Sequence, residues 1–169
     1  MAHLQRTRSR LILVEGASDR AALETLARRR GLEPEIVVLG GAYAVGNYVR
    51  AASAAVELVG LCDAREEEIF RRVLEQVHVC APDLEGELIR ALGSERVEQI
   101  IDAEGELASF RTLQKQPAQR GQRLEAQLNR FLGGRSGNKE RYARRFTEAL
   151  DLDRVPAPLD AVLGHPDRP

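Results

Sequence analysis

Short apolar runs alternate with helix-like segments through the first half of the chain. Residues 11–14, 36–39, 56–62 and 77–80 are mostly apolar without interruption, which is typical of strands buried on both faces. The segments between them have apolar residues at helical spacing, as in residues 22–27. Strands separated by helices of this length predict β-α-β units and a mostly parallel sheet.

After Pro82 the strand pattern ends, and the apolar spacing indicates helices only. We therefore predict an α/β domain over residues 9–105, a basic helical extension over 106–150 and a proline-containing tail over 151–169. Four of the seven prolines lie in that tail, so it should be mostly irregular, with a short helix near residues 159–163. The helices expected after Pro82 cover residues 84–92, 97–103, 107–113, 123–132 and 139–150.

The formal net charge of −1 hides an asymmetry between the two parts of the chain. Residues 1–110 carry a net charge of −6, whereas residues 111–145 carry ten basic groups and two acids, a net of +8. Such an asymmetry suggests an anionic partner, and nucleic acid is the natural choice. The alternative is that the charges simply solvate a helix face. The candidate phosphate contacts are Arg111, Lys115, Arg120, Arg123, Arg130, Arg135 and Arg141.

Other features limit the class of protein. With 43% hydrophobic and 30% charged residues, the composition is that of a soluble globular protein. No apolar stretch approaches the roughly 20 residues that a membrane span needs, and no signal peptide is recognisable. Cys62 and Cys80 both lie in apolar runs, as core thiols do. We therefore expect a cytoplasmic protein with no membrane partner.

Carboxylates follow the predicted strands at the points where these strands end. Glu15 follows the first strand, Asp63 ends the third, and Asp83 and Glu85 follow the fourth, while glycines at 40–41 end the second. The carboxyl ends of parallel strands share one edge of a sheet, which is where ligands of such folds bind. Clustered carboxylates repel one another unless a cation lies among them. Oxygen ligands of this kind suit Mg²⁺ or Mn²⁺.

Two motifs carry a resemblance to a known family. The sequence L-V-E-G-A-S-D-R at residues 13–20, followed by V-G-L-C-D at 59–63, resembles a TOPRIM domain. The V-E-G-x-S-D form is most similar to the TOPRIM portion of OLD-family endonucleases. The resemblance implies an α/β, Rossmann-like TOPRIM fold with a four-stranded, mainly parallel sheet flanked by helices and a helical C-terminal extension. It also implies metal-dependent hydrolysis or nicking of a nucleic-acid phosphodiester, as in DNA repair or processing.

The resemblance also implies roles for individual residues. Glu15 would serve as a metal ligand and general acid or base, and Asp63 and Asp19 would bind the metal. A downstream acidic motif matches Asp83 or Glu85, of which we favour Glu85. Lys139 follows a glycine-rich turn and, by the same analogy, would be a catalytic residue that stabilises charge developing on the scissile phosphate.

The third-strand motif departs from the family pattern. Where the family has D-x-D, this chain has Asp63-Ala64-Arg65. Glu66 or Glu67 could replace the missing ligand; otherwise one metal position is lost, which puts a two-metal mechanism in doubt. Two functions therefore stay open. One is a Mg²⁺- or Mn²⁺-dependent nuclease, acting on DNA rather than RNA, and the other is a non-catalytic nucleic-acid-binding or accessory protein.

A glycine-rich segment and the three tyrosines do not indicate further chemistry. Residues 133–140, G-G-R-S-G-N-K-E, resemble a P-loop, but Glu140 stands where Ser or Thr is needed and a helix is predicted before them. We therefore expect no use of ATP. Tyr43 and Tyr48 follow the glycine turn and Tyr142 lies in a predicted helix, so none is placed as an obvious covalent nucleophile. The sequence does not indicate an oligomeric state.

Overall fold

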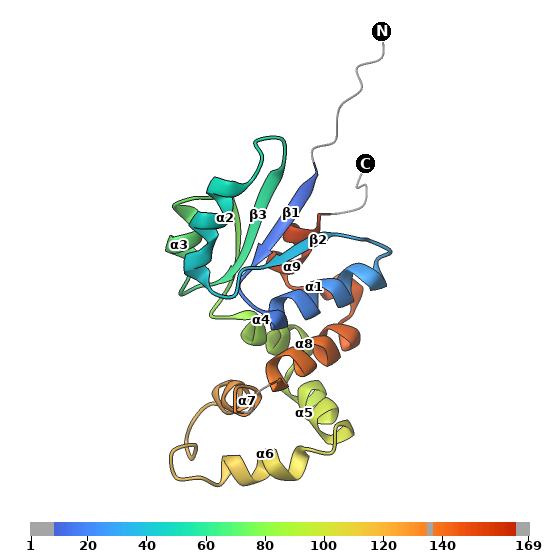
Figure 1. The fold of residues 1–169 in the computed structure, drawn as a ribbon. Helices are drawn as coiled ribbons and strands as arrows, with labels where there is room; N and C mark the ends of the chain where they lie inside the picture. The colour runs from blue at the N-terminus through green and yellow to red at the C-terminus, as the bar shows by residue number, and fades with distance from the viewer. Residues whose placement is uncertain (1–8, 135–136, 165–169) are drawn as a thin grey trace.

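A four-stranded, all-parallel sheet is the centre of the protein in this computed structural model, which describes residues 9–134 and 137–164 (Figure 1). The strands are β1 (Arg10–Val14), β2 (Glu35–Val38), β3 (Glu57–Asp63) and β4 (Gln76–Cys80), in the order β2-β1-β3-β4. The register pairs Val14 with Val38 of β2 and with Leu61 of β3. The carboxyl ends of the three strands therefore lie side by side.

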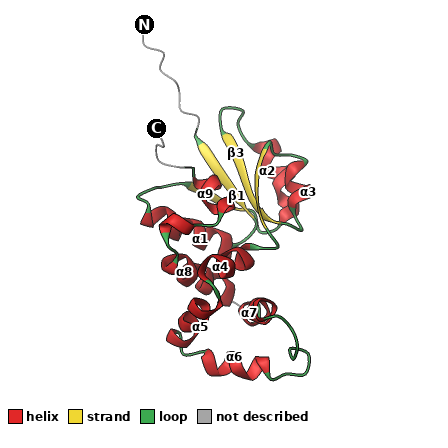
Figure 2. Cartoon of the chain, turned by 180° about the vertical axis from the view of Figure 1, so that it is seen from behind, coloured by secondary structure: helices red, strands yellow, loops and turns green. Residues whose placement is uncertain are grey.

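Helices cover both faces of the sheet, as the alternation of side chains along β1 requires (Figure 2). Leu13 faces the layer formed by the turn Ala42–Ala44 (η1), α2 (Val45–Ala51) and α3 (Glu67–Arg71). Ile12 and Val14 face the opposite layer and belong to a larger core. The helices of that layer are α1 (Ala17–Arg29), α4 (Leu84–Leu92), α8 (Asn138–Ala149) and α9 (Ala157–Leu163).

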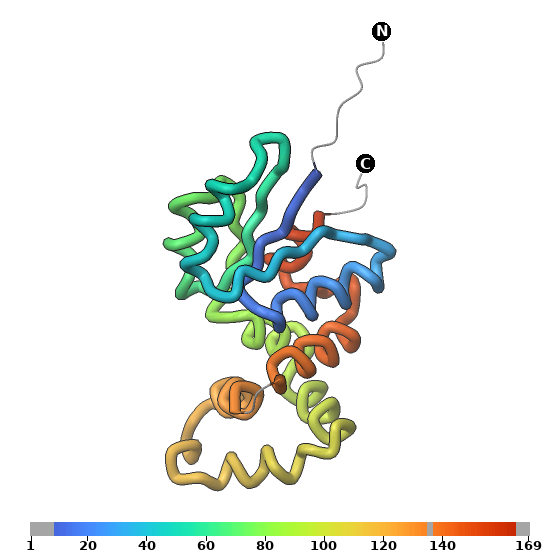
Figure 3. Tube along the Cα trace, viewed as in Figure 1, coloured from blue at the N-terminus to red at the C-terminus, as the bar shows by residue number. Residues whose placement is uncertain are grey.

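Three helices continue from this larger layer beyond the carboxyl edge of the sheet: α5 (Ser94–Ala103), α6 (Leu107–Gln114) and α7 (Leu124–Leu132) (Figure 3). Aromatic rings join α6 and α7 to α8. The ring of Phe131 lies 5.3 Å from that of Phe110 and 6.3 Å from that of Tyr142, both in edge-to-face geometry. The predicted α/β class and parallel sheet are thus confirmed, with helices following the sheet.

The hydrophobic core runs across the boundaries that the sequence suggested between three parts. Helix α8, from the predicted basic extension, packs along α1 in the sheet layer. Leu159 and Val162 of α9 are fully buried against the same core, and this helix contacts β3 and β4. The short helix expected near residues 159–163 is therefore part of the core. No helix in the described part of the chain is long and apolar enough to cross a membrane.

Candidate functional site

A cavity of about 430 Å³ opens at the carboxyl edge of the sheet, and it brings together acids from distant parts of the chain. Glu15 follows β1, Asp19 lies in the first turn of α1, and Asp63 ends β3. Glu85 comes from the first turn of α4, and Lys139 from the first turn of α8. All five were named from the sequence, and all five line this cavity.

Asp19 is held in place by the start of its own helix. Gly16 is the N-cap residue, and its N–H donates to Oδ2 of Asp19 at 3.0 Å. The Asp19 side chain is buried, with 9% of its surface exposed. Burial raises the pKa of Asp19 to about 7, and the charges of Glu85 and Glu15 add to this, although the Gly16 hydrogen bond opposes it. Asp19 is therefore protonated to a large extent at neutral pH when no cation is near.

Asp63 lies at the same edge of the sheet, in a similarly unfavourable environment for a charged carboxylate. Its Oδ1 accepts a hydrogen bond from the backbone N–H of Leu84 at 3.1 Å, which ties the end of β3 to the start of α4. The pKa of Asp63 is raised to about 7. Burial is the main cause, and repulsion from the charges of Asp19, Asp83 and Glu85 contributes as well. The charged form of Asp63 is thus destabilised by burial and by the neighbouring acids, which is the condition that a bound cation relieves.

Glu85 and Asp83 were the two candidates for the downstream acidic motif, and their side chains lie in different places. Asp83 is the N-cap of α4: its Oδ1 accepts from the N–H of Gly86 at 2.8 Å. The Glu85 side chain points into the cavity, with only 4% of its surface exposed. Its Oε2 lies 3.6 Å from Nζ of Lys139, and its buried Oε1 has no hydrogen-bond partner among the described residues.

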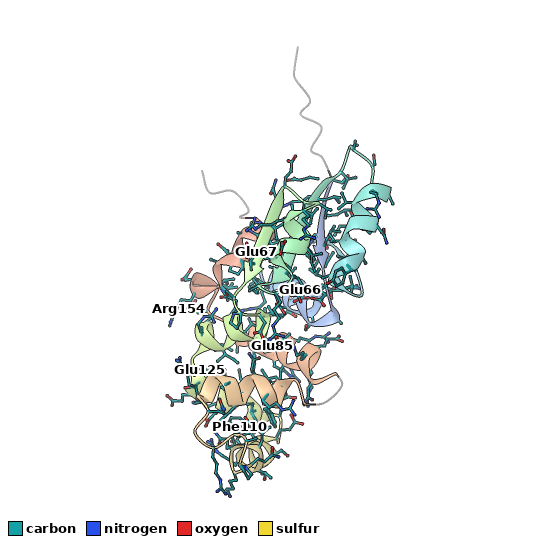
Figure 4. The ribbon with its side chains drawn as sticks, turned by 90° about the vertical axis from the view of Figure 1, so that its left-hand side faces the viewer. Glu66, Glu67, Glu85, Phe110, Glu125 and Arg154 are labelled. Atoms are coloured by element: carbon teal, nitrogen blue, oxygen red, sulfur yellow. The ribbon has the colours of Figure 1, made fainter. Side chains whose placement is uncertain are left out.

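Glu15 lies at the cavity with a second glutamate close enough to affect it. Burial raises the pKa of Glu15, the negative charge of Glu66 raises it further, and Lys139 opposes both. Oε2 of Glu66 is buried and has no hydrogen-bond partner in the described part of the chain. Glu66 directly precedes α3, beside the end of β3 (Figure 4). It is therefore the glutamate nearer to the acidic cavity.

Glu67, which the sequence also suggested as a metal ligand, is placed elsewhere. Its Oε1 lies 2.6 Å from Nε of Arg71, four residues along the same helix, and both side chains are partly exposed. Glu67 lines a separate depression, together with Arg65. The guanidinium of Arg65, in the position of the missing second aspartate, is thus not part of the acidic cavity.

The donor set fits a hard divalent cation. All four acids at the cavity offer oxygen atoms only, which Mg²⁺ and Mn²⁺ prefer. One buried oxygen of Glu85 lacks a partner, as does one of Glu66 close by. Among the described residues, no three acidic, histidine or cysteine side chains already stand in a metal-binding arrangement. Binding would therefore require these carboxylates to move toward one another.

The basic residues named from the sequence divide into two groups. Arg111 pairs with Glu98, and Arg141 pairs with Glu104 and Glu106, so these two contribute to the packing of α5, α6 and α8. Arg111 is itself exposed, as are Lys115, Arg120, Arg123 and Arg130. Of these, Arg120 donates to the carbonyl oxygen of Lys115, and Arg123 lies 3.8 Å from Glu125. Arg135 lies outside the described residues.

Sequence reasoning missed one wall of the cavity. Val38, at the end of β2, lines it next to Gly40 and Gly41, and Ala17 and Ser18 line it at the start of α1. The register of β2 on β1 places Val38 and the two glycines there, because Val38 pairs with Val14, whereas Ala17 and Ser18 follow directly after Glu15 and Gly16. Their sequence signal was limited to the glycine pair that ends the second strand.

Comparison with solved structures shows what this fold is similar to. The C-terminal region of the OLD protein of Xanthomonas campestris pv. campestris matches with a TM-score of 0.63, at 19% identity, over 94% of each chain. The C-terminal region of the OLD protein of Burkholderia pseudomallei matches with a TM-score of 0.62, at 16% identity, over 92% of this chain and 95% of that one. The chain therefore has the fold of these C-terminal regions, as its TOPRIM-like motifs predicted.

Comparison of the amino-acid sequence with family models and with curated proteins found no match.

Proposed function

We propose that this protein hydrolyses or nicks phosphodiester bonds in nucleic acid, DNA rather than RNA, with Mg²⁺ or Mn²⁺ bound among Glu15, Asp19, Asp63 and Glu85. The observation that carries the proposal is the single cavity that collects these four carboxylates and Lys139 at the carboxyl edge of the sheet. The shared fold with C-terminal regions of OLD proteins supports it, because the sequence motifs resemble OLD-family endonucleases at the same edge.

Each side chain has a role that follows from its surroundings. A bound divalent cation would neutralise the phosphate and lower the pKa of an attacking water. Asp19 and Asp63 would hold the cation, and they would lose their protons when it binds. Glu15 has a raised pKa and a less buried position than Asp19, so it suits proton transfer as well as metal binding. The ammonium of Lys139 would lie against charge developing on the phosphate.

A second function is favoured by one specific observation. The position of the second aspartate of the D-x-D motif is Arg65, whose side chain is exposed and lines another depression. A chain that has lost this ligand could bind nucleic acid as an accessory protein without cutting it. The two functions differ in what they require of Glu15: the nuclease needs it for cleavage, and the accessory protein does not.

Nicking of supercoiled plasmid DNA separates these functions. The wild-type chain should convert supercoiled to open-circular plasmid with Mn²⁺ or Mg²⁺, but not with EDTA. Glu15→Gln and Asp63→Asn should abolish conversion, whereas the matched control Glu68→Gln should not, because Glu68 is exposed and pairs with Arg72 away from the acidic cavity. Salt-sensitive DNA binding by a wild-type chain that nicks with neither metal would reject the nuclease in favour of the accessory function.

A further inference from the structure

Tyr43 is the only exposed aromatic residue in the described part of the chain, with 86% of its surface accessible. The four phenylalanines and Tyr142 are buried, and Tyr48 is half-buried against the core cluster of α2 and α3. Tyr43 lies in the short turn η1, beside the acidic cavity. Its exposure is notable because the chain has few aromatic residues.

The turn that carries Tyr43 is fixed to the edge of the cavity. The N–H of Leu39 donates to the carbonyl oxygen of Val14 at 2.9 Å, and that of Gly40 to the carbonyl oxygen of Glu15 at 3.1 Å. On the other side of Tyr43, the N–H of Ala44 donates to the carbonyl oxygen of Gly41 at 3.1 Å. Gly41 has a φ of 145°, which favours glycine. The backbone therefore holds Tyr43 two residues from a cavity-lining glycine.

The cavity-lining residues that lie nearest to Tyr43 along the chain are uncharged. These are Val38, Gly40 and Gly41, and they bring an apolar side chain and bare backbone. Val38 is 36% exposed, so an apolar surface lies open to a ligand there. The charged groups come from the residue after β1 and from β3, α1, α4 and α8. A ligand in this cavity would meet an exposed apolar side chain as well as the charged groups.

We propose that Tyr43 stacks on an unpaired nucleobase adjacent to the phosphodiester that the cavity binds, so that the substrate is single-stranded or locally unpaired nucleic acid. A nucleotide has the same division into a charged phosphate and a flat apolar base. Base–aromatic stacking is tolerant of sequence and needs a ring free in solvent. Bases within a duplex are stacked on their neighbours and offer no free face. This inference rests on the proposed function, because it takes the cavity to bind a phosphodiester.

Fluorescence of 2-aminopurine tests the stacking directly, since stacking on an aromatic ring quenches this base. The probe is a short single-stranded DNA with one 2-aminopurine, titrated with the full chain in Ca²⁺ to provide an oxygen-liganded cation. Tyr43→Phe keeps the ring and should keep both quenching and affinity. Tyr43→Ala should lose the quenching and about tenfold in affinity for single strands, with affinity for a blunt duplex unchanged.

The outcomes separate this inference from the proposed function. If the wild-type chain nicks plasmid but Tyr43→Ala quenches and binds as the wild type does, the stacking role is wrong and the nuclease stands. If the wild-type chain never nicks but shows the Tyr43-dependent quenching, the nuclease is wrong and the stacking role stands. If Tyr43→Ala instead changes the mass in solution measured by light scattering, without changing single-strand affinity, the ring is a contact between copies and the proposal is overturned.

Discussion

Nζ of Lys139 lies 3.6 Å from Oε2 of Glu85, which joins the first turn of α8 to the first turn of α4 at the acidic cavity. Glu85 is almost wholly buried, whereas the Lys139 side chain is half exposed. The ammonium therefore pairs with a carboxylate that has one oxygen unpartnered among the described residues. In the absence of a cation, Lys139 partly offsets the negative charge of the cavity, and it lowers the pKa of both Glu15 and Asp19.

Replacing Lys139 should separate catalysis from metal binding. Lys139→Met keeps much of the side-chain volume but removes the charge, so nicking should fall on the order of 10²-fold, as when one group that stabilises transition-state charge is lost. The affinity for Mn²⁺, measured by isothermal titration, should stay within a few-fold of the wild type. Arg72→Met is the control, because Arg72 is exposed, pairs with Glu68 and lines a separate depression. Equal nicking by the two variants would refute a catalytic role for Lys139.

The raised pKa values of Asp19 and Asp63 predict a pH-dependent stability. Both carboxyls keep their protons in the folded chain up to about pH 7, whereas in the unfolded chain they lose them near pH 4. Between these values the folded state binds more protons, so the contribution of the pair to stability is present below about pH 4 and is lost as the pH rises to about 7.

Urea unfolding without metal at pH 5.5 and pH 8 measures this contribution. Asp63→Asn cannot ionise at that position, so its decrease in free energy of unfolding between the two pH values should be smaller than that of the wild type. Added Mg²⁺ should stabilise the wild type more at pH 8 than at pH 5.5, because protons and the cation compete for the same oxygens. An identical pH dependence in both chains would contradict the raised pKa values.

Glu66 and Glu67 are neighbours in sequence, but the structure predicts different effects of replacing them. Within the described part of the chain, Glu66 has a buried oxygen without a partner, and its charge raises the pKa of Glu15, whereas Glu67 pairs with Arg71 on a partly exposed helix face. Glu66→Gln should weaken Mn²⁺ binding roughly tenfold, which is the low end for altering a group that supports a metal site. Glu67→Gln should leave Mn²⁺ binding unchanged; a larger effect at Glu67 would place the replacement ligand there.

Much of the fold follows from the sequence because the central strands β1 and β3 are largely buried on both faces and so are mostly apolar. The strand expected at residues 56–62 is Glu57–Asp63, and the helix expected at 123–132 is Leu124–Leu132. The attachment of α9 to the core could not be predicted in this way. Its two buried side chains, Leu159 and Val162, are too few to distinguish a docked helix from a turn in a proline-containing tail.

The cavity residues could be found because parallel strands deliver their following residues to one edge. The ion-pair partners of individual charged residues could not be predicted, because they depend on residues distant in sequence or on the position of a residue around its helix. Arg141 is paired by Glu106, from the turn before α6, and Glu67 is turned toward Arg71 by the helical repeat. The exposure of Tyr43 likewise depends on how β2 and η1 are fixed to the end of β1.

The exposed basic residues predict a salt-dependent contact with nucleic acid that is separable from folding. Arg123, the N-cap residue of α7, and Arg130, in its last turn, have exposed side chains, whereas Arg111 is held by Glu98. The double variant Arg123→Ala/Arg130→Ala should lower the slope of log affinity against log salt by up to about 2, since each lost phosphate contact removes about 0.9 for duplex DNA. Its unfolding should be that of the wild type.

Arg111→Ala is the matched comparison for that double variant. It removes a bidentate ion pair between α5 and α6, so it should lower the midpoint of urea unfolding while leaving the salt slope nearly unchanged. Fluorescence anisotropy with a labelled duplex, measured at several salt concentrations, gives the slope for each chain. A slope that falls for Arg111→Ala and not for the double variant would place the nucleic-acid contact on the α5–α6 side and contradict the assignment to α7.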